Sequence, residues 1–163
     1  MTSRIVLVSS ISFLLGSSAF RVGQIVAPSI GTPSVNLPKG QNAWAVHVVR
    51  VGGLTGDGSG DIKITSENKV TCGDPDAHCK GALMPSDFRL LSELILSSQF
   101  AKTKKQSSES LPCFDCFTTA ITVRRREAKN KDRSYSGKWE SSTTGTVPPD
   151  LIRIAQKVLA LDL

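Results

Sequence analysis

Apolar and polar side chains alternate along residues 117–123, directly after a pair of cysteines. Phe117, Thr119, Ile121 and Val123 point to one side of an extended chain, and the residues between them point to the other. A period of two with many β-branched residues is typical of a strand with one buried and one wet face. We therefore expect a central strand here, followed by a basic turn.

Several other segments have the pattern of strands. Residues 43–51 carry apolar side chains on both alternating sets of positions, as in a strand covered on both faces. Residues 61–66 and 133–140 alternate between polar and apolar positions. The glycine-rich stretch 52–60 joins the first two segments, so we expect a long hairpin. Residues 70–72 add a short strand that is not counted among the four expected in the sheet.

Two segments have helical periodicity. Pro85 begins the first, and an apolar stripe with helical spacing continues from Phe88 to near Phe100. The second begins at Pro149 and carries its stripe from Leu151 to Leu161. The order strand-strand-helix-strand-strand-helix predicts an α+β fold, with a four-stranded antiparallel sheet and both helices on one face.

The N-terminal residues predict the compartment in which the protein is found. Residues 1–19 combine a positive start, an apolar run of about a dozen residues and small residues before Ala19, which together predict a cleaved signal peptide. The apolar run is shorter than the ~20 residues of a membrane-spanning helix, so we expect a membrane anchor only if this segment is not cleaved. Residues 20–42 are rich in Pro, Gly and Ser and predict an irregular lead-in, and residues 43–163 predict a single domain. The protein is therefore expected in the periplasm, a lumen or the extracellular space.

Charge is concentrated in one hairpin. The chain has 163 residues, 39% hydrophobic and 21% charged, with a net charge of +6, which suits a soluble globular domain. A basic patch contributes much of this excess: Arg124, Arg125, Arg126, Lys129, Lys131 and Arg133. Such a run is usual at a solvated hairpin tip and can also attract an acidic partner. No aromatic–basic interleaving accompanies it, so we expect no nucleic-acid binding.

Four cysteines allow three disulfide pairings. Disulfides are the expected state in an exported protein. The local pairs Cys72–Cys79 and Cys113–Cys116 are favoured because each would fix the end of a strand, and cross-links between the two segments remain the alternative. Cys113 and Cys116 also form a CxxC motif, but it precedes a strand instead of the helix N-terminus that activates thioredoxin-like thiols. A further hypothesis is that the cysteines bind zinc with His78 as an additional ligand, although the cysteine spacing differs from the usual zinc-binding pairs.

The residues that catalysis needs do not form a recognisable arrangement. His47 and His78 are the two histidines, and no G-x-S-x-G nucleophile motif occurs. The glycine-rich loop lacks the Lys-Ser/Thr and helix of a P-loop. Asp74, Asp76 and Asp115 do not have the spacing of an EF-hand. We therefore expect a protein that is not an enzyme and that has no metal and no cofactor.

One short motif resembles a known family. Arg50, Gly52, Gly53, Leu54 and Gly56 end a strand in the pattern Arg-x-Gly-Gly-hydrophobic-x-Gly, which is similar to the emfourin family of small protein inhibitors of thermolysin-like metalloproteases. The order of the later elements fits over residues 43–163. The chain departs from the family in its signal peptide, its four cysteines and its longer loops at 67–83 and 102–115. The resemblance implies a non-catalytic protein that inhibits a protease by occluding its cleft. It also implies that the motif residues belong to the part of the protein that binds this partner.

Two other functions remain open on the residues alone. The protein could be an accessory or structural subunit of an envelope or membrane complex that docks through the basic hairpin 124–133. It could also be a thiol oxidoreductase that uses Cys113 and Cys116. The exported binding protein is the leading expectation, with a metalloprotease or a membrane-complex subunit as its protein partner.

Overall fold

The computed structural model describes residues 30–53, 59–73, 79, 81–100, 116–141, 147–161 and 163, apart from the side chain of Lys129. The elements are β1 (Trp44–Gly52), β2 (Gly60–Thr65), β3 (Val70–Cys72), α1 (Pro85–Ser97), β4 (Phe117–Glu127), a short 3₁₀ turn (Ala128–Asn130), β5 (Lys131–Glu140) and α2 (Pro149–Leu159). The expected signal peptide over residues 1–19 lies outside the described residues.

The strands form one antiparallel sheet in the order β3-β2-β1-β4-β5. The expectation of a four-stranded sheet with the order β-β-α-β-β-α is therefore wrong, because β3 is a fifth strand between β2 and α1. β3 has three residues, too few to show a period of two. It is positioned by a turn at Asn68, whose φ is 57° and whose side-chain amide bonds both the N–H and the carbonyl of Leu83 at 3.0 Å. The broader α+β class is confirmed.

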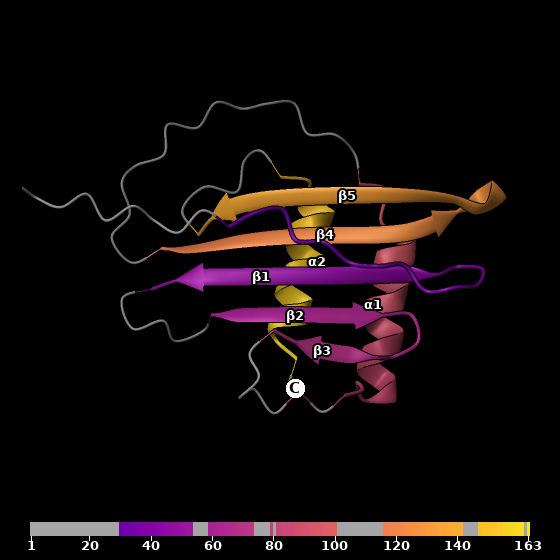
Figure 1. Cartoon of the computed structure of the whole chain (residues 1–163), viewed down its shortest axis with the longest axis horizontal. Coiled ribbons are helices and arrows are strands. Elements are labelled where there is room, and N and C mark those ends of the chain that lie inside the picture. The colour runs from indigo at the N-terminus through magenta and orange to yellow at the C-terminus, as the bar shows by residue number, and fades with distance from the viewer. Residues whose placement is uncertain are drawn as a thin grey trace, which may run out of the picture.

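The hydrophobic core lies between the sheet and the two helices, which are both on the far side of the sheet in Figure 1. The strand register brings Val46 of β1 beside Ile64 of β2 and Val123 of β4, and all three side chains are fully buried. From the helices, residues such as Leu91 and Ile154 pack against this face. Burial of such side chains is the main favourable term for folding.

The opposite face of the sheet is covered by residues 30–40, which have no helix or strand. Figure 1 shows this segment crossing in front of the sheet, on the side away from α1 and α2. Val35 is 7% exposed, and Ala45 and Ala120, which lie on this face by the strand register, are buried. We call residues 30–40 the covering segment. The sheet is therefore covered on both faces at its centre, over β1 and β4, as the apolar residues on both sides of residues 43–51 require.

Candidate functional site

The glycines of the motif at residues 50–56 lie at the end of β1, beside the start of β4. Gly52 and Gly53 have φ angles of 120° and 77°, a region that favours glycine. A Cβ atom at Gly52 would collide with the carbonyl oxygen of Cys116, and one at Gly53 would lie 2.8 Å from the ring of Phe117. Backbone conformation and close packing therefore account for both glycines.

The arginine of the same motif also contacts the start of β4. The guanidinium carbon of Arg50 lies 3.9 Å from the ring centroid of Phe117, a cation–π contact. Leu54 and Gly56 lie outside the described residues. The motif thus joins the ends of two neighbouring strands, and the structure gives its described members a role within the fold.

The basic patch lies at the other end of the sheet. β1 and β4 are antiparallel, with Gly52 opposite Phe117 at one end and Trp44 opposite Arg125 at the other. The part of β4 from Phe117 to Arg125 separates these ends by roughly 27 Å, at about 3.4 Å for each residue. The motif and the basic patch therefore do not combine into one compact site (Figure 1).

Arg126 connects two turns that come from distant parts of the chain. Its backbone N–H donates to the carbonyl of Ala43 at 2.8 Å, and its Nη1 donates to the carbonyl of Gly40 at 3.0 Å. Its Nε and Nη2 donate to the two carboxylate oxygens of Asp132 at 2.9 and 3.3 Å. These hydrogen bonds raise the pKa of Arg126 and lower the pKa of Asp132. We call residues 40–43 and 127–131 together the two-turn surface.

A hollow of about 230 Å³ lies between these turns, lined by Gln41, Asn42, Arg126, Glu127, Ala128 and Asn130. Asn42 and Asn130 adopt φ angles of 56° and 55°, which asparagine tolerates better than most residues. Both are exposed. The two-turn surface is thus polar and shaped by fixed backbone turns.

Glu127 accepts contacts from three side chains of the hairpin. Tyr135 donates its hydroxyl hydrogen to Oε1 at 2.6 Å, while Arg125 and Arg133 each approach the carboxylate at 3.4 Å. The hydrogen bond from Tyr135 is the main cause that lowers the pKa of Glu127. Burial, followed by the same hydrogen bond, raises the pKa of Tyr135. The hairpin is therefore held by a charge network of its own.

Arg125 stabilises the end of α1. Its Nη1 donates to the carbonyls of Ile95 at 3.1 Å and of Ser98 at 2.6 Å, and its guanidinium lies 5.0 Å from the ring centroid of Phe100. The last carbonyls of a helix lack partners within the helix, and a cation near them is favoured by the helix dipole. Arg125 therefore supplies a cap that comes from the sheet.

Most of the basic patch is thus engaged within the chain. Arg124 donates to the carbonyl of Val35 at 2.9 Å, so all three arginines of β4 bind backbone carbonyls of other segments. Lys131 is exposed, and the side chain of Arg133 is 50% exposed. The side chain of Lys129 lies outside the described part of the chain. Among the described side chains of the basic patch, those at the hairpin tip are therefore the most exposed.

The cysteine prediction is confirmed for one pair. Cys72 and Cys79 form a disulfide with a Cα–Cα distance of 6.1 Å. Cys116 is disulfide-bonded as well, and its expected partner Cys113 lies outside the described residues. A disulfide is the state typical of an oxidising compartment. His78, Asp74, Asp76 and Asp115 also lie outside the described residues.

His47 lies in β1 with both ring nitrogens occupied. Nε2 is 2.7 Å from the Asp61 carboxylate, and Nδ1 is 2.9 Å from the Ser34 carbonyl, so its partners are a side chain and a backbone group. The residue is buried. In the described part of the chain no three His, Cys, Asp or Glu residues gather as a metal site would require. His47 therefore links the sheet to the covering segment.

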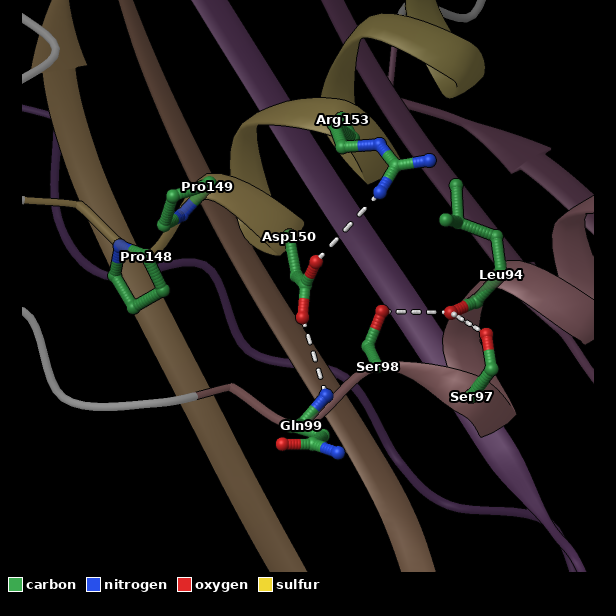
Figure 2. Close-up of a pocket in the computed structure, with 8 residues that line it drawn as sticks. All are labelled: Leu94, Ser97, Ser98, Gln99, Pro148, Pro149, Asp150 and Arg153. Carbon is green, nitrogen blue, oxygen red and sulfur yellow. Dashed lines mark hydrogen bonds and ion pairs between the residues drawn. The ribbon is translucent and has the colours of Figure 1, made fainter.

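A groove of about 450 Å³ lies where α1 ends and α2 begins, and sequence reasoning did not identify it. Figure 2 shows Asp150 between the backbone N–H of Gln99, which donates to it at 3.1 Å, and the guanidinium of Arg153 at 4.0 Å. Ser98 donates its hydroxyl hydrogen to the Leu94 carbonyl at 2.6 Å. Asp150 and Ser98 are therefore paired with other groups of the groove itself.

The covering segment is the second feature that sequence reasoning missed. Its backbone carbonyls accept hydrogen bonds from side chains of three strands, namely His47, Arg124, Arg126 and Lys138. The only local signal is the Pro33-Ser34-Val35 alternation, in which the outer two residues are buried and Ser34 is exposed. Three residues are too few for an alternation with a period of two to be recognised in the sequence.

Comparisons with known proteins return no relative. No family model matches the chain, and no curated protein or solved structure matches it. Among the described residues, no helix is long and apolar enough to cross a membrane. The function is therefore argued from the contacts within the chain.

Proposed function

We propose that this chain is an exported, non-catalytic binding protein that inhibits a thermolysin-like metalloprotease, as its resemblance to emfourin-like proteins implies. The observation that carries the proposal is the pair of turns connected by Arg126, whose contacts run to Ala43, Gly40 and Asp132. A surface that is ordered before binding loses little conformational entropy in the complex. It can therefore fill a cleft without large rearrangement.

The exposed residues of the two-turn surface indicate the kind of protease surface that it would contact. Asn42 and Asn130 are polar, and Lys131 adds an exposed positive charge. An acidic rim around the protease cleft would attract this charge and increase the rate of association. Arg126 lies behind the turns and holds them, so it acts as a positioning residue.

Export is supported by the Cys72–Cys79 disulfide together with the N-terminal sequence pattern. The intact mass of protein from its native source, measured before and after reduction with alkylation, tests this part. We expect loss of residues 1–19 and two disulfides. A full-length mass or four free thiols would contradict export.

Inhibition is tested with the mature protein against a panel of thermolysin-like proteases. We expect inhibition at micromolar concentration. Lys131→Glu should weaken it roughly tenfold by reversing a charge at the contact rim. Arg89→Glu makes the same charge change at an exposed position of α1 and should leave the inhibition constant unchanged. The proposal fails if no protease in the panel is slowed by the mature protein.

The alternative partner, a subunit of an envelope or membrane complex, would use the same end of the molecule. The observation that favours it is the exposed charge of Lys131 and Arg133 at the hairpin tip. The test is co-purification from native membranes with and without Lys131→Glu and Arg133→Glu. Unchanged association of the double variant would exclude docking through the hairpin.

A further inference from the structure

The face of the sheet opposite the helices carries a row of side-chain donors that bind the backbone carbonyls of the covering segment. Lys138 donates to Ile30, His47 to Ser34, Arg124 to Val35 and Arg126 to Gly40, at 3.3, 2.9, 2.9 and 3.0 Å. The donors come from β5, β1 and β4, so three strands contribute. We call this surface the carbonyl-binding face.

Two side chains of the covering segment are buried on this face. Pro33 and Val35 are buried, and Ser34 between them is exposed, as expected for an extended segment lying on a surface. Below them the sheet has small side chains, Ala45 and Ala120, which are themselves buried. The small side chains leave room for the segment to approach the sheet.

These contacts select an extended backbone more than a particular sequence. Hydrogen bonds to carbonyl oxygens are available to almost any residue, so only the two buried positions restrict the side chains. Residues 30–38 form no strand with the sheet, so no ladder fixes the register. Pro33 and Pro38 hold φ near the extended value and reduce the entropy lost on docking.

The covering segment also leaves space beside it. A hollow of about 170 Å³ is lined by Gly31, Thr32, Pro33, Ala120, Ser136, Gly137 and Lys138. Residues larger than Gly31 or Thr32 in a docked peptide would fill this space and add apolar contact. The chain's own segment therefore does not use the whole surface.

We propose that the carbonyl-binding face is a peptide-binding site that residues 30–40 occupy in the free protein. Its partner is an extended, proline-containing segment of another protein with apolar residues at two alternate positions. Main-chain hydrogen bonds supply affinity and the two apolar positions supply specificity, as in other modes of extended-peptide recognition. This inference shares the hydrogen bond from Arg126 to Gly40 with the two-turn surface, and it does not use the contact proposed for Lys131 or the hairpin tip.

The covalent connection of residues 30–40 to the rest of the chain favours binding of this segment over a free peptide. A segment joined to its site by a short linker has an effective concentration in the millimolar range, so residues 30–40 exclude a free peptide of similar affinity. A closed fraction of about 99% would weaken the apparent affinity for a free peptide roughly a hundredfold. A change that weakens the covering segment should therefore strengthen binding of the free peptide.

The experiment uses the full mature chain and a fluorescein-labelled synthetic peptide with the sequence of residues 30–40. Binding is measured by fluorescence anisotropy for the wild type, for Val35→Asp and for the milder Pro33→Ser. We expect the peptide to bind both variants at least tenfold more tightly than the wild type. Adding Arg124→Met to Val35→Asp should reduce that binding, because one carbonyl donor is lost. A peptide with Asp in place of its valine should not bind.

The variants are checked for native folding by circular dichroism before binding is compared. If Val35→Asp does not fold, the comparison is made with Pro33→Ser. The proposal is overturned if the peptide binds neither folded variant. It is also overturned if light scattering shows that the variants form dimers which the peptide does not dissociate. That outcome would show that the uncovered sheet face associates with another copy of the chain instead of binding an extended peptide.

Discussion

Replacing Arg125 with methionine tests whether a side chain of the sheet caps α1. In the native structure its Nη1 donates to the carbonyls of Ile95 and Ser98 at 3.1 and 2.6 Å. Methionine keeps an unbranched apolar stem and removes every donor and the charge. The carbonyls at the end of the helix then lose partners that the helix itself cannot supply.

The size of the effect follows from burial and charge. The Arg125 side chain is 15% exposed, so water replaces its hydrogen bonds poorly. A hydrogen bond to a charged group contributes about 1.5–3 kcal/mol, and a cation at a helix C-terminus about 0.3–1 kcal/mol. We expect Arg125→Met to lower the free energy of unfolding by about 3 kcal/mol.

Urea unfolding followed by circular dichroism measures this change, with the slope m compared between variants. Arg133→Met is the matched control, because it makes the same substitution in the same hairpin. Its side chain is 50% exposed and forms an ion pair with Glu127 at 3.4 Å. We expect a loss of about 0.5 kcal/mol or less for this control. Equal losses for the two variants would refute the assignment of Arg125 as the helix cap.

Three further changes test other contacts. Gly52→Ala forces a side chain into a φ of 120° and against a backbone carbonyl of the neighbouring strand, so we expect a loss of about 2–4 kcal/mol in urea unfolding; an unchanged midpoint would contradict this. Replacing Cys72 and Cys79 by alanine opens a loop with a sequence separation of 7, and thermal unfolding should report a loss of about 2.5 kcal/mol, whereas an unchanged melting temperature would count against it. The lowered pKa of Glu127 contributes stability that is present above about pH 4.3 and lost as the pH falls through its folded-state pKa. Tyr135→Phe removes the main cause, so acid titration of the unfolding free energy should show a smaller loss, and an identical acid dependence would contradict this origin.

The long strands could be predicted because alternation persists over many residues. The patterns at 43–51 and 117–123 agree with β1 and β4, although β4 continues to Glu127. Residues 124–127 at its end are all charged, so they do not alternate between apolar and polar positions and the sequence pattern did not include them in the strand. β3 was missed as a member of the sheet because three residues carry no period, and its position depends on the Asn68 turn and its bonds to Leu83.

The contacts of the basic patch could not be predicted, because they join residues that are far apart in sequence. Arg124 binds a carbonyl 89 residues away, Arg125 one 30 residues away and Arg126 one 86 residues away. A charge run describes composition, and it contains no information on which distant carbonyl each guanidinium reaches. The position of the covering segment could not be predicted either, because its backbone carbonyls make most of its polar contacts and its side-chain sequence does not show them.

The two faces of the sheet are closed by different kinds of interaction, and this determines where substitutions act. On the helix side, residues such as Ile121 and Ile154 are fully buried in one shared core, so shortening them leaves a cavity and destabilises the whole fold. On the other side, side-chain donors hold backbone carbonyls, and only Pro33 and Val35 of the covering segment are buried. Ordering a segment costs about 1–2 kcal/mol for each residue, which offsets much of what these few contacts contribute. The covering segment can therefore open while the helix side stays closed, and substitutions at its buried positions should change occupancy of the carbonyl-binding face before they change global stability.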